Sequence, residues 1–215
     1  MSVGQRDRST ADKRIDTIAA VLLSVAAVAT AWSSYQANRW TGEQAKAFAS
    51  ATGARVESTR SSSLANAQTQ IDVAVFTQWV DARLRGEEDL STFYEQRFRA
   101  EFQPAFRAWL ATDPFDDPSA PPSPFAMDEY QLAATNEADE LSVIAETSAE
   151  LARTYIQRAT NYVLGVVLFA TALFFAGIST KLSSTNLRGV ILGVGCFVFV
   201  LTASWIATFP ISLSI

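Results

Sequence analysis

The sequence predicts an all-α integral membrane protein with three transmembrane helices and a long extracytoplasmic helical hairpin or coiled-coil domain. Apolar residues gather near 17–35, 162–178 and 187–209, and each block approaches the roughly 20 residues that a helix needs to cross a bilayer. The 126 residues between the first two blocks have an ordinary polar composition. Proline is absent from 15 to 103 and from 128 to 209, so long uninterrupted helices are expected there.

The first span, residues 15–35, has an alternative interpretation. A basic leader followed by a short apolar run and an A-x-A site at Ala29 to Ala31 is also typical of a cleaved signal peptide. Acidic residues in the leader and helix-compatible sequence beyond Tyr35 favour a retained span. The second span, 160–180, carries no charge, and the third, 188–209, carries none after Arg188.

Lysine and arginine residues beside the spans predict the orientation, because they favour the cytoplasmic side. They precede the first span and lie at the link between the second and third, at Arg6, Arg8, Lys13, Arg14, Lys181 and Arg188. The tail 1–14 and the link 181–187 are therefore expected in the cytoplasm of a multi-pass cell (inner) membrane protein. The domain 36–159 and the end 210–215 then face outward. Aromatic anchors near the outer span ends agree: Trp32, Tyr35, Trp40, Tyr155, Tyr162 and Trp205.

The outward domain is acidic, with 11 basic and 19 acidic residues between Gln36 and Ala159. The first span is expected to continue outward as a helix, with a possible break at Gly53. Small or modest side chains recur along it every three or four residues, a pattern suited to close helix packing, at Ala45, Phe48, Thr52, Val56, Thr59, Ser63, Ala67 and Ile71.

A turn is expected at Gly86, and Thr92 with Glu95 predicts a capping box for the next helix. That helix carries an aromatic stripe at Tyr94, Phe98, Phe102, Phe106 and Trp109, and Pro104 is expected to kink it. The stripe is interpreted as core; the alternative is a face for a partner, a lipid surface or self-association.

The segment 112–127 holds five prolines and is expected to form a loop. Its aspartates lack the glycine and distal glutamate of a calcium-binding EF-hand loop, so a solvated turn is the preferred interpretation. Asp128 with Gln131 predicts the cap of a helix that runs from about Glu129 through the second span. A second seam follows, whose simplest partner is the outgoing helix: Leu141, Ala145, Ser148, Ala152, Tyr155, Ala159 and Tyr162.

The residue inventory argues against most catalytic chemistry. Histidine is absent and Cys196 is the single cysteine, which excludes a histidine-based triad, a zinc site built on these ligands and a disulfide within the chain. No phosphate loop, dinucleotide motif or basic nucleic-acid patch is present, and the spans carry no internal charge for a proton relay. We therefore expect a non-enzymatic protein without metal or cofactor and without nucleic-acid partners.

Small residues inside the spans point to helix association. Gly189 and Gly193 form a GxxxG motif with Gly195 close by, and Ala27 and Ala31 lie in the first span. The leading expectation is a bilayer-embedded subunit that forms a homo-oligomer or joins a larger membrane complex, with a structural or sensing role. Contact within one three-helix bundle is the plainer alternative.

The sequence is compatible with two further function classes. A homo-oligomeric cation-permeable channel is the runner-up, with an acidic outer vestibule built from Glu87, Glu88, Asp89, Asp113, Asp116 and Asp117. A membrane-bound hydrolase that uses a serine or aspartate is a distant third.

Overall fold

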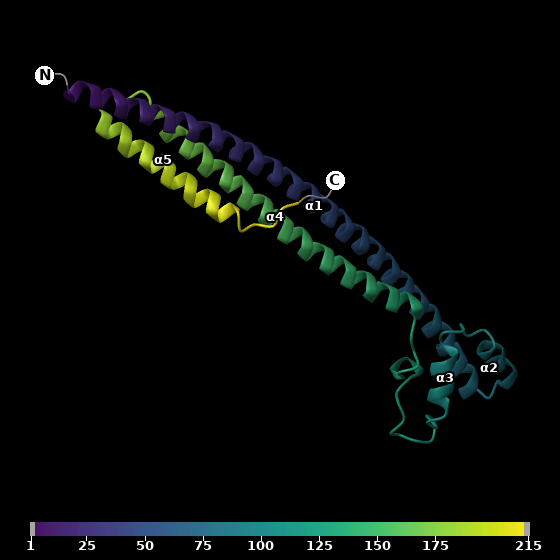
Figure 1. The fold of residues 1–215 in the computed structure, drawn as a ribbon. Coiled ribbons are helices and arrows are strands. Elements are labelled where there is room, and N and C mark those ends of the chain that lie inside the picture. The colour runs from purple at the N-terminus through teal and green to yellow at the C-terminus, as the bar shows by residue number, and fades with distance from the viewer. Residues whose placement is uncertain (1–2, 213–215) are drawn as a thin grey trace. The chain divides into compact units, whose positions relative to one another are not determined.

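The computed structural model describes residues 3–212, and side chains from residue 12 onward. Within this part the chain is helical and contains no strand (Figure 1). Its elements are α1 (Val3–Leu84), α2 (Glu88–Glu95), α3 (Gln103–Leu110), the 3-10 helix η1 (Pro124–Ala126), α4 (Ala133–Ser179) and α5 (Thr185–Ile206). Residues 1–2 of the predicted tail 1–14 and residues 213–215 of the predicted segment 210–215 lie outside the described residues.

Three of these helices, α1, α4 and α5, are long and apolar enough to cross a membrane. The most apolar 18-residue stretch has a mean hydropathy of 2.2 in α4 and in α5, and of 1.9 in α1. The prediction of an all-α chain with three such helices is therefore confirmed. The orientation, the outward hairpin and the coiled coil stay predictions.

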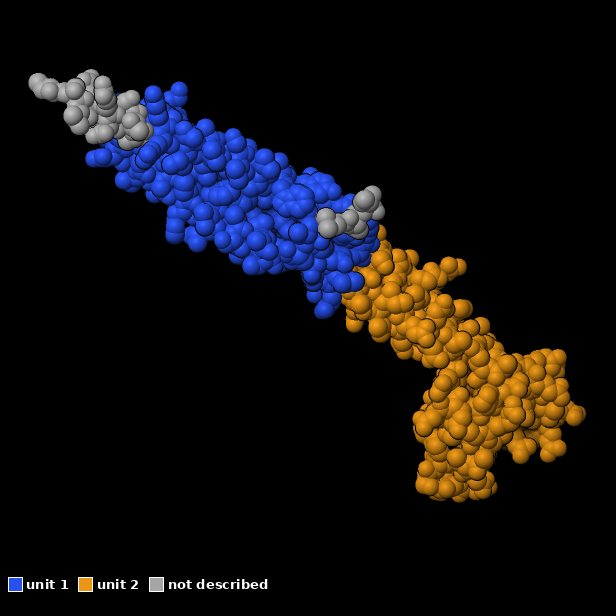
Figure 2. Space-filling model, viewed as in Figure 1, with its two compact units in different colours: residues 1–48, 149–215 blue, residues 49–148 orange. Residues whose placement is uncertain are grey.

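The chain divides into two compact units (Figure 2): residues 1–48 with 149–215, and residues 49–148. In the first unit, α1, α4 and α5 pack through alanine and leucine side chains near one end, where Ala19, Leu22, Ala176 and Leu192 are buried together. A second cluster joins Trp40, Tyr162, Phe169 and Ile206 with smaller neighbours. At Gly165 an added Cβ would overlap the terminal methyl of Ile206, so a larger residue there would force the Ile206 side chain to move.

In the second unit, α1 and α4 lie side by side and a set of short elements packs at the end of α1. Ser58 Oγ donates to the Ala138 carbonyl at 2.8 Å, and Ser61 Oγ donates to Glu137 Oε2 at 3.1 Å. The short elements enclose an aromatic core of Trp79, Phe98, Phe102, Phe106 and Trp109.

Several local expectations were wrong. The helix α1 continues through Gly53, where open space surrounds the glycine. The aromatic stripe does not lie on one kinked helix, because α2 ends at Glu95 and Pro104 occupies the first turn of α3, where proline is well tolerated.

The expected helix caps also differ from the structure. The helix α2 begins at Glu88, before Thr92, and no side chain caps its start, so the capping box does not form. The helix α4 begins at Ala133 instead of Glu129, and the Gln131 side chain donates to the Asp128 carbonyl in a turn ahead of it. The turn at Gly86 is present, with a positive φ of 74° that favours glycine.

Candidate functional site

The small residues of the spans fall on two different surfaces. Gly189 and Gly193 on α5 are exposed, and beyond the backbone of α5 itself no atom of the described residues lies within 4 Å of the Cβ position that either would have. Ala27 and Ala31 on α1 are exposed as well. Gly195 is buried instead, and its Cβ position lies 3.2 Å from Phe175 Cβ. The GxxxG pair is therefore available to a neighbour, whereas Gly195 serves packing within the chain.

The two predicted seams differ in how far they are buried. The seam of α1 from Ala45 to Ile71 is exposed along its whole length, whereas Ala145, Ala152, Ala159 and Tyr162 of the α4 seam are buried. The residues of α1 that pack on α4 in the second unit form a different stripe, which includes Ala51, Ser58, Ser61 and Ala65. Its serines make polar contacts, so hydropathy alone does not mark it as a packing face.

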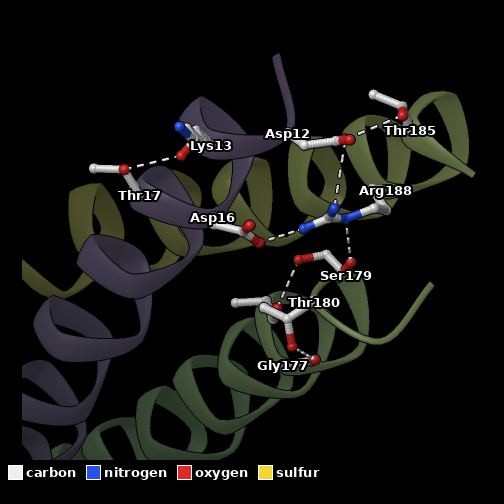
Figure 3. Close-up of polar contacts among 10 residues, drawn as sticks. Asp12, Lys13, Asp16, Thr17, Gly177, Ser179, Thr180, Thr185 and Arg188 are labelled. Atoms are coloured by element: carbon white, nitrogen blue, oxygen red, sulfur yellow. Dashed lines mark hydrogen bonds and ion pairs between the residues drawn. The ribbon is translucent and has the colours of Figure 1, made fainter. Parts of the chain in front are cut away.

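Arg188 joins the three long helices at one end of the first unit (Figure 3). Its Nε donates to the Ser179 carbonyl of α4 at 3.0 Å, and its Nη atoms pair with Asp12 and Asp16 of α1. Thr185 Oγ1 also donates to Asp12 Oδ1, at 3.0 Å. Only 12% of the Arg188 side chain is exposed, so these contacts tie the first turn of α5 to both neighbouring helices.

The aromatic anchors of the predicted outer boundary divide between surface and interior. Trp32, Tyr35 and Trp205 are exposed, Tyr155 is half-buried, and Trp40 and Tyr162 are buried. Tyr162 donates its hydroxyl to the Pro210 carbonyl at 3.2 Å, and the Ser212 amide donates to Gln36 Oε1 at 3.0 Å. The segment after α5 therefore packs against α4 at Tyr162 and against α1 at Gln36.

Arg158 lies against two of these anchors. Its guanidinium carbon is 4.6 Å from the centre of the Trp40 ring and 5.8 Å from that of Tyr155, and the two rings are 5.4 Å apart. This arrangement is a cation–π contact that holds the planar guanidinium in place.

The acidic residues of the proposed vestibule lie in two exposed groups of the second unit. Glu87, Glu88 and Asp89 are exposed at the start of α2 and border an open hollow of about 510 Å³. In the proline-rich segment, Asp117 accepts hydrogen bonds from the amide and hydroxyl of Ser119, which lower the pKa of its carboxyl. Among the side chains that the structure describes, no three acidic or cysteine residues gather as metal ligands would.

The aromatic stripe lies in the core of the second unit. Phe98, Phe102, Phe106 and Trp109 are buried, and Tyr94 packs against them half-buried. The indole Nε1 of Trp109 donates to the Pro121 carbonyl at 2.8 Å, so the stripe also secures the proline-rich segment.

A buried polar network in the second unit has no counterpart in the sequence analysis. Asp72, 2% exposed, accepts hydrogen bonds from Arg99 Nη1 at 2.8 Å and from the Tyr130 hydroxyl at 3.1 Å. Arg99 also pairs with Glu101, whose other oxygen accepts the Ala133 amide at the start of α4. The network links α1, the segment between α2 and α3, and the start of α4.

Burial raises the pKa of Asp72, although Arg99 and the Tyr130 hydroxyl partly offset that effect. The pKa of Tyr130 is also raised, first by burial and then by the nearby Asp72 charge. No short sequence pattern marks this network, because Asp72 lies 27 residues from Arg99 and 58 residues from Tyr130.

Comparisons with protein-family models, with curated proteins and with solved structures found no match to this chain.

Proposed function

We propose that the chain is a non-enzymatic membrane subunit that assembles with further copies of itself, or with a partner complex, through the small-residue faces of its spans. The observation that carries this proposal is the open surface at Gly189 and Gly193. Both glycines lie on the outside of α5, and nothing in the described chain approaches their Cβ positions.

Hydrocarbon does not drive apolar side chains together, so helices associate in membranes where small residues let backbones approach and gain van der Waals contact. Gly189 and Gly193 are spaced to present one such face. Ala27 and Ala31 give α1 an exposed small-residue face of its own. The α5 motif is therefore free for a contact outside the chain, whereas Gly165 and Gly195 are occupied by contacts within it.

The test is the mass of the purified full-length chain in a mild detergent, measured by light scattering. The chain alone has a mass of 23.4 kDa, so self-assembly gives a multiple of that value and a partner complex gives additional protein bands. The double substitution Gly189→Leu with Gly193→Leu should shift the protein toward 23.4 kDa, with association weakened at least about tenfold.

Two matched variants separate assembly from folding. Gly177→Leu places the same side chain in open space on α4, and we expect it to leave the mass unchanged. Gly195→Leu would collide with Phe175 and Ala172, so it should reduce the thermal stability of the chain itself. If the wild-type chain has the mass of a monomer and no partner copurifies with it, the proposal is refuted.

A further inference from the structure

The charges of the described chain are unevenly distributed along its sequence. Residues 49–148 carry 7 basic and 17 acidic side chains. The two segments that directly flank the outer ends of the first and second spans, 36–48 and 149–159, carry 4 basic and 2 acidic side chains. In the predicted topology, the acidic domain therefore meets the membrane through a short basic collar, defined here as Arg39, Lys46, Arg153 and Arg158.

Arg158 is the member of the collar with the most defined surroundings. It is half-buried, and the Trp40 and Tyr155 rings hold its guanidinium at 4.6 and 5.8 Å. The positions three and four residues away on α4 are Thr154, Tyr155, Asn161 and Tyr162, so no carboxylate lies at helical spacing to pair with it. Of the two acidic residues in the flanking segments, Glu43 is already paired with Lys46 at 2.9 Å.

Two buried donors of α1 in this region have no acceptor among the described residues. Trp40, whose ring faces Arg158, has a buried Nε1–H with no hydrogen-bond acceptor among the described residues, and so does Gln36 Nε2 one turn earlier. Buried donors of this kind are rare in folded proteins, but these two have almost no accessible surface, so a ligand outside the chain cannot reach them without a rearrangement. The partly exposed guanidinium of Arg158 therefore supplies the N–H donors of the site, which favours an anion rich in oxygen acceptors.

The membrane boundary supplies such an anion. Tryptophan and tyrosine prefer the headgroup level of a bilayer, and arginine beside them binds the phosphates of anionic lipids. Arg158 and Trp40 lie in the sequence just beyond the apolar stretches of their spans, where the predicted topology places the headgroup phosphates.

We propose that Arg158, held by Trp40 and Tyr155, is a binding site for the phosphodiester group of an anionic phospholipid, with the rest of the basic collar adding electrostatic attraction. The lipid oxygens accept hydrogen bonds from the guanidinium, and the aromatic rings keep the guanidinium facing the headgroup layer. This site is independent of the assembly face on α5.

The experiment is native mass spectrometry of the full-length chain released from detergent with added phosphatidylglycerol or phosphatidylcholine. We expect the wild type to retain phosphatidylglycerol in preference to phosphatidylcholine, and Arg158→Gln to bind it about fivefold more weakly. Arg158→Lys, which keeps the charge but loses the planar stacked group, should fall between the two.

The control is Arg97→Gln, because Arg97 is also stacked on an aromatic ring, 3.4 Å from the centre of Phe93, but belongs to the acidic unit. It should retain lipid like the wild type. Equal retention by Arg158→Gln and the wild type would overturn the proposal, as would equal retention of the two lipids. If millimolar inorganic phosphate displaces the lipid completely, the ligand is a free anion and the lipid assignment is wrong.

Discussion

Phe102 offers the most quantitative test of the second unit. Its side chain is fully buried, and its ring centre lies 5.0 to 6.1 Å from the centres of five other rings. Replacing it with alanine removes its ring contacts with Phe76 of α1 and with Phe125 of the proline-rich segment. Truncation of a buried phenylalanine costs about 3–5 kcal/mol, and burial of some 150–250 Å² at about 25 cal/mol per Å² gives a similar value.

A loss near 4 kcal/mol corresponds to a several-hundredfold increase in the population of the locally opened state. Amide hydrogen exchange of the full-length chain in detergent, followed by mass spectrometry, measures that increase for the peptides of α2 and α3. Phe93→Ala is the matched control, because 45% of that phenylalanine is exposed and its loss should cost under about 1 kcal/mol. If Phe102→Ala exchanges within tenfold of Phe93→Ala, the aromatic cluster does not hold the unit together.

Three other predictions address the charged groups. The pKa of Asp72 is raised in the folded state, so low pH favours the folded protein. This contribution to stability is complete below the ordinary pKa of aspartate and is lost as the pH rises through the raised pKa of the folded state. Asp72→Asn should therefore flatten the gain in stability of the second unit on acidification from pH 7 to about 4, measured by thermal unfolding; an unchanged slope would contradict the assignment. Arg188→Gln removes the guanidinium that pairs with Asp12 and Asp16, and should destabilise the start of α5 by about 1–3 kcal/mol, seen as faster hydrogen exchange there. Exchange like that of the wild type would show that these contacts are dispensable. If the assembled protein conducts cations, neutralising residues 87–89 should lower cation selectivity in bilayer recordings, and unchanged selectivity would remove them from the pore mouth.

The spans were predictable because their signal is local. An apolar run of about 20 residues indicates a membrane helix whatever it packs against, so α5 and the apolar parts of α1 and α4 were recognisable from composition. The aromatic stripe was also recognised as core, since Phe98, Phe102 and Phe106 recur at helical spacing. The break between α2 and α3 was missed because the stripe keeps its spacing across a turn that carries no proline before Pro104.

The contacts between distant residues were not predictable in the same way. Asp72, Arg99 and Tyr130 are ordinary polar residues in the sequence, and only the fold brings them into one buried network. The face of α1 that meets α4 was assigned to the wrong stripe, because Ser58 and Ser61 pack through hydrogen bonds instead of apolar area. Which small residues remain exposed, such as Gly193, likewise depends on how the three helices are arranged.

Because α1 is an unbroken helix, insertions and deletions within it are restricted in length. The residues of α1 that are buried in the first unit include Ala19, Leu22 and Ala26 and then, further along, Ser33, Gln36 and Trp40. Each residue inserted into an α-helix rotates everything beyond it by about 100°. A single insertion between positions 26 and 33 would turn one of these two groups away from α4 and α5, so natural variants should gain or lose residues in this stretch only in steps close to whole helical turns.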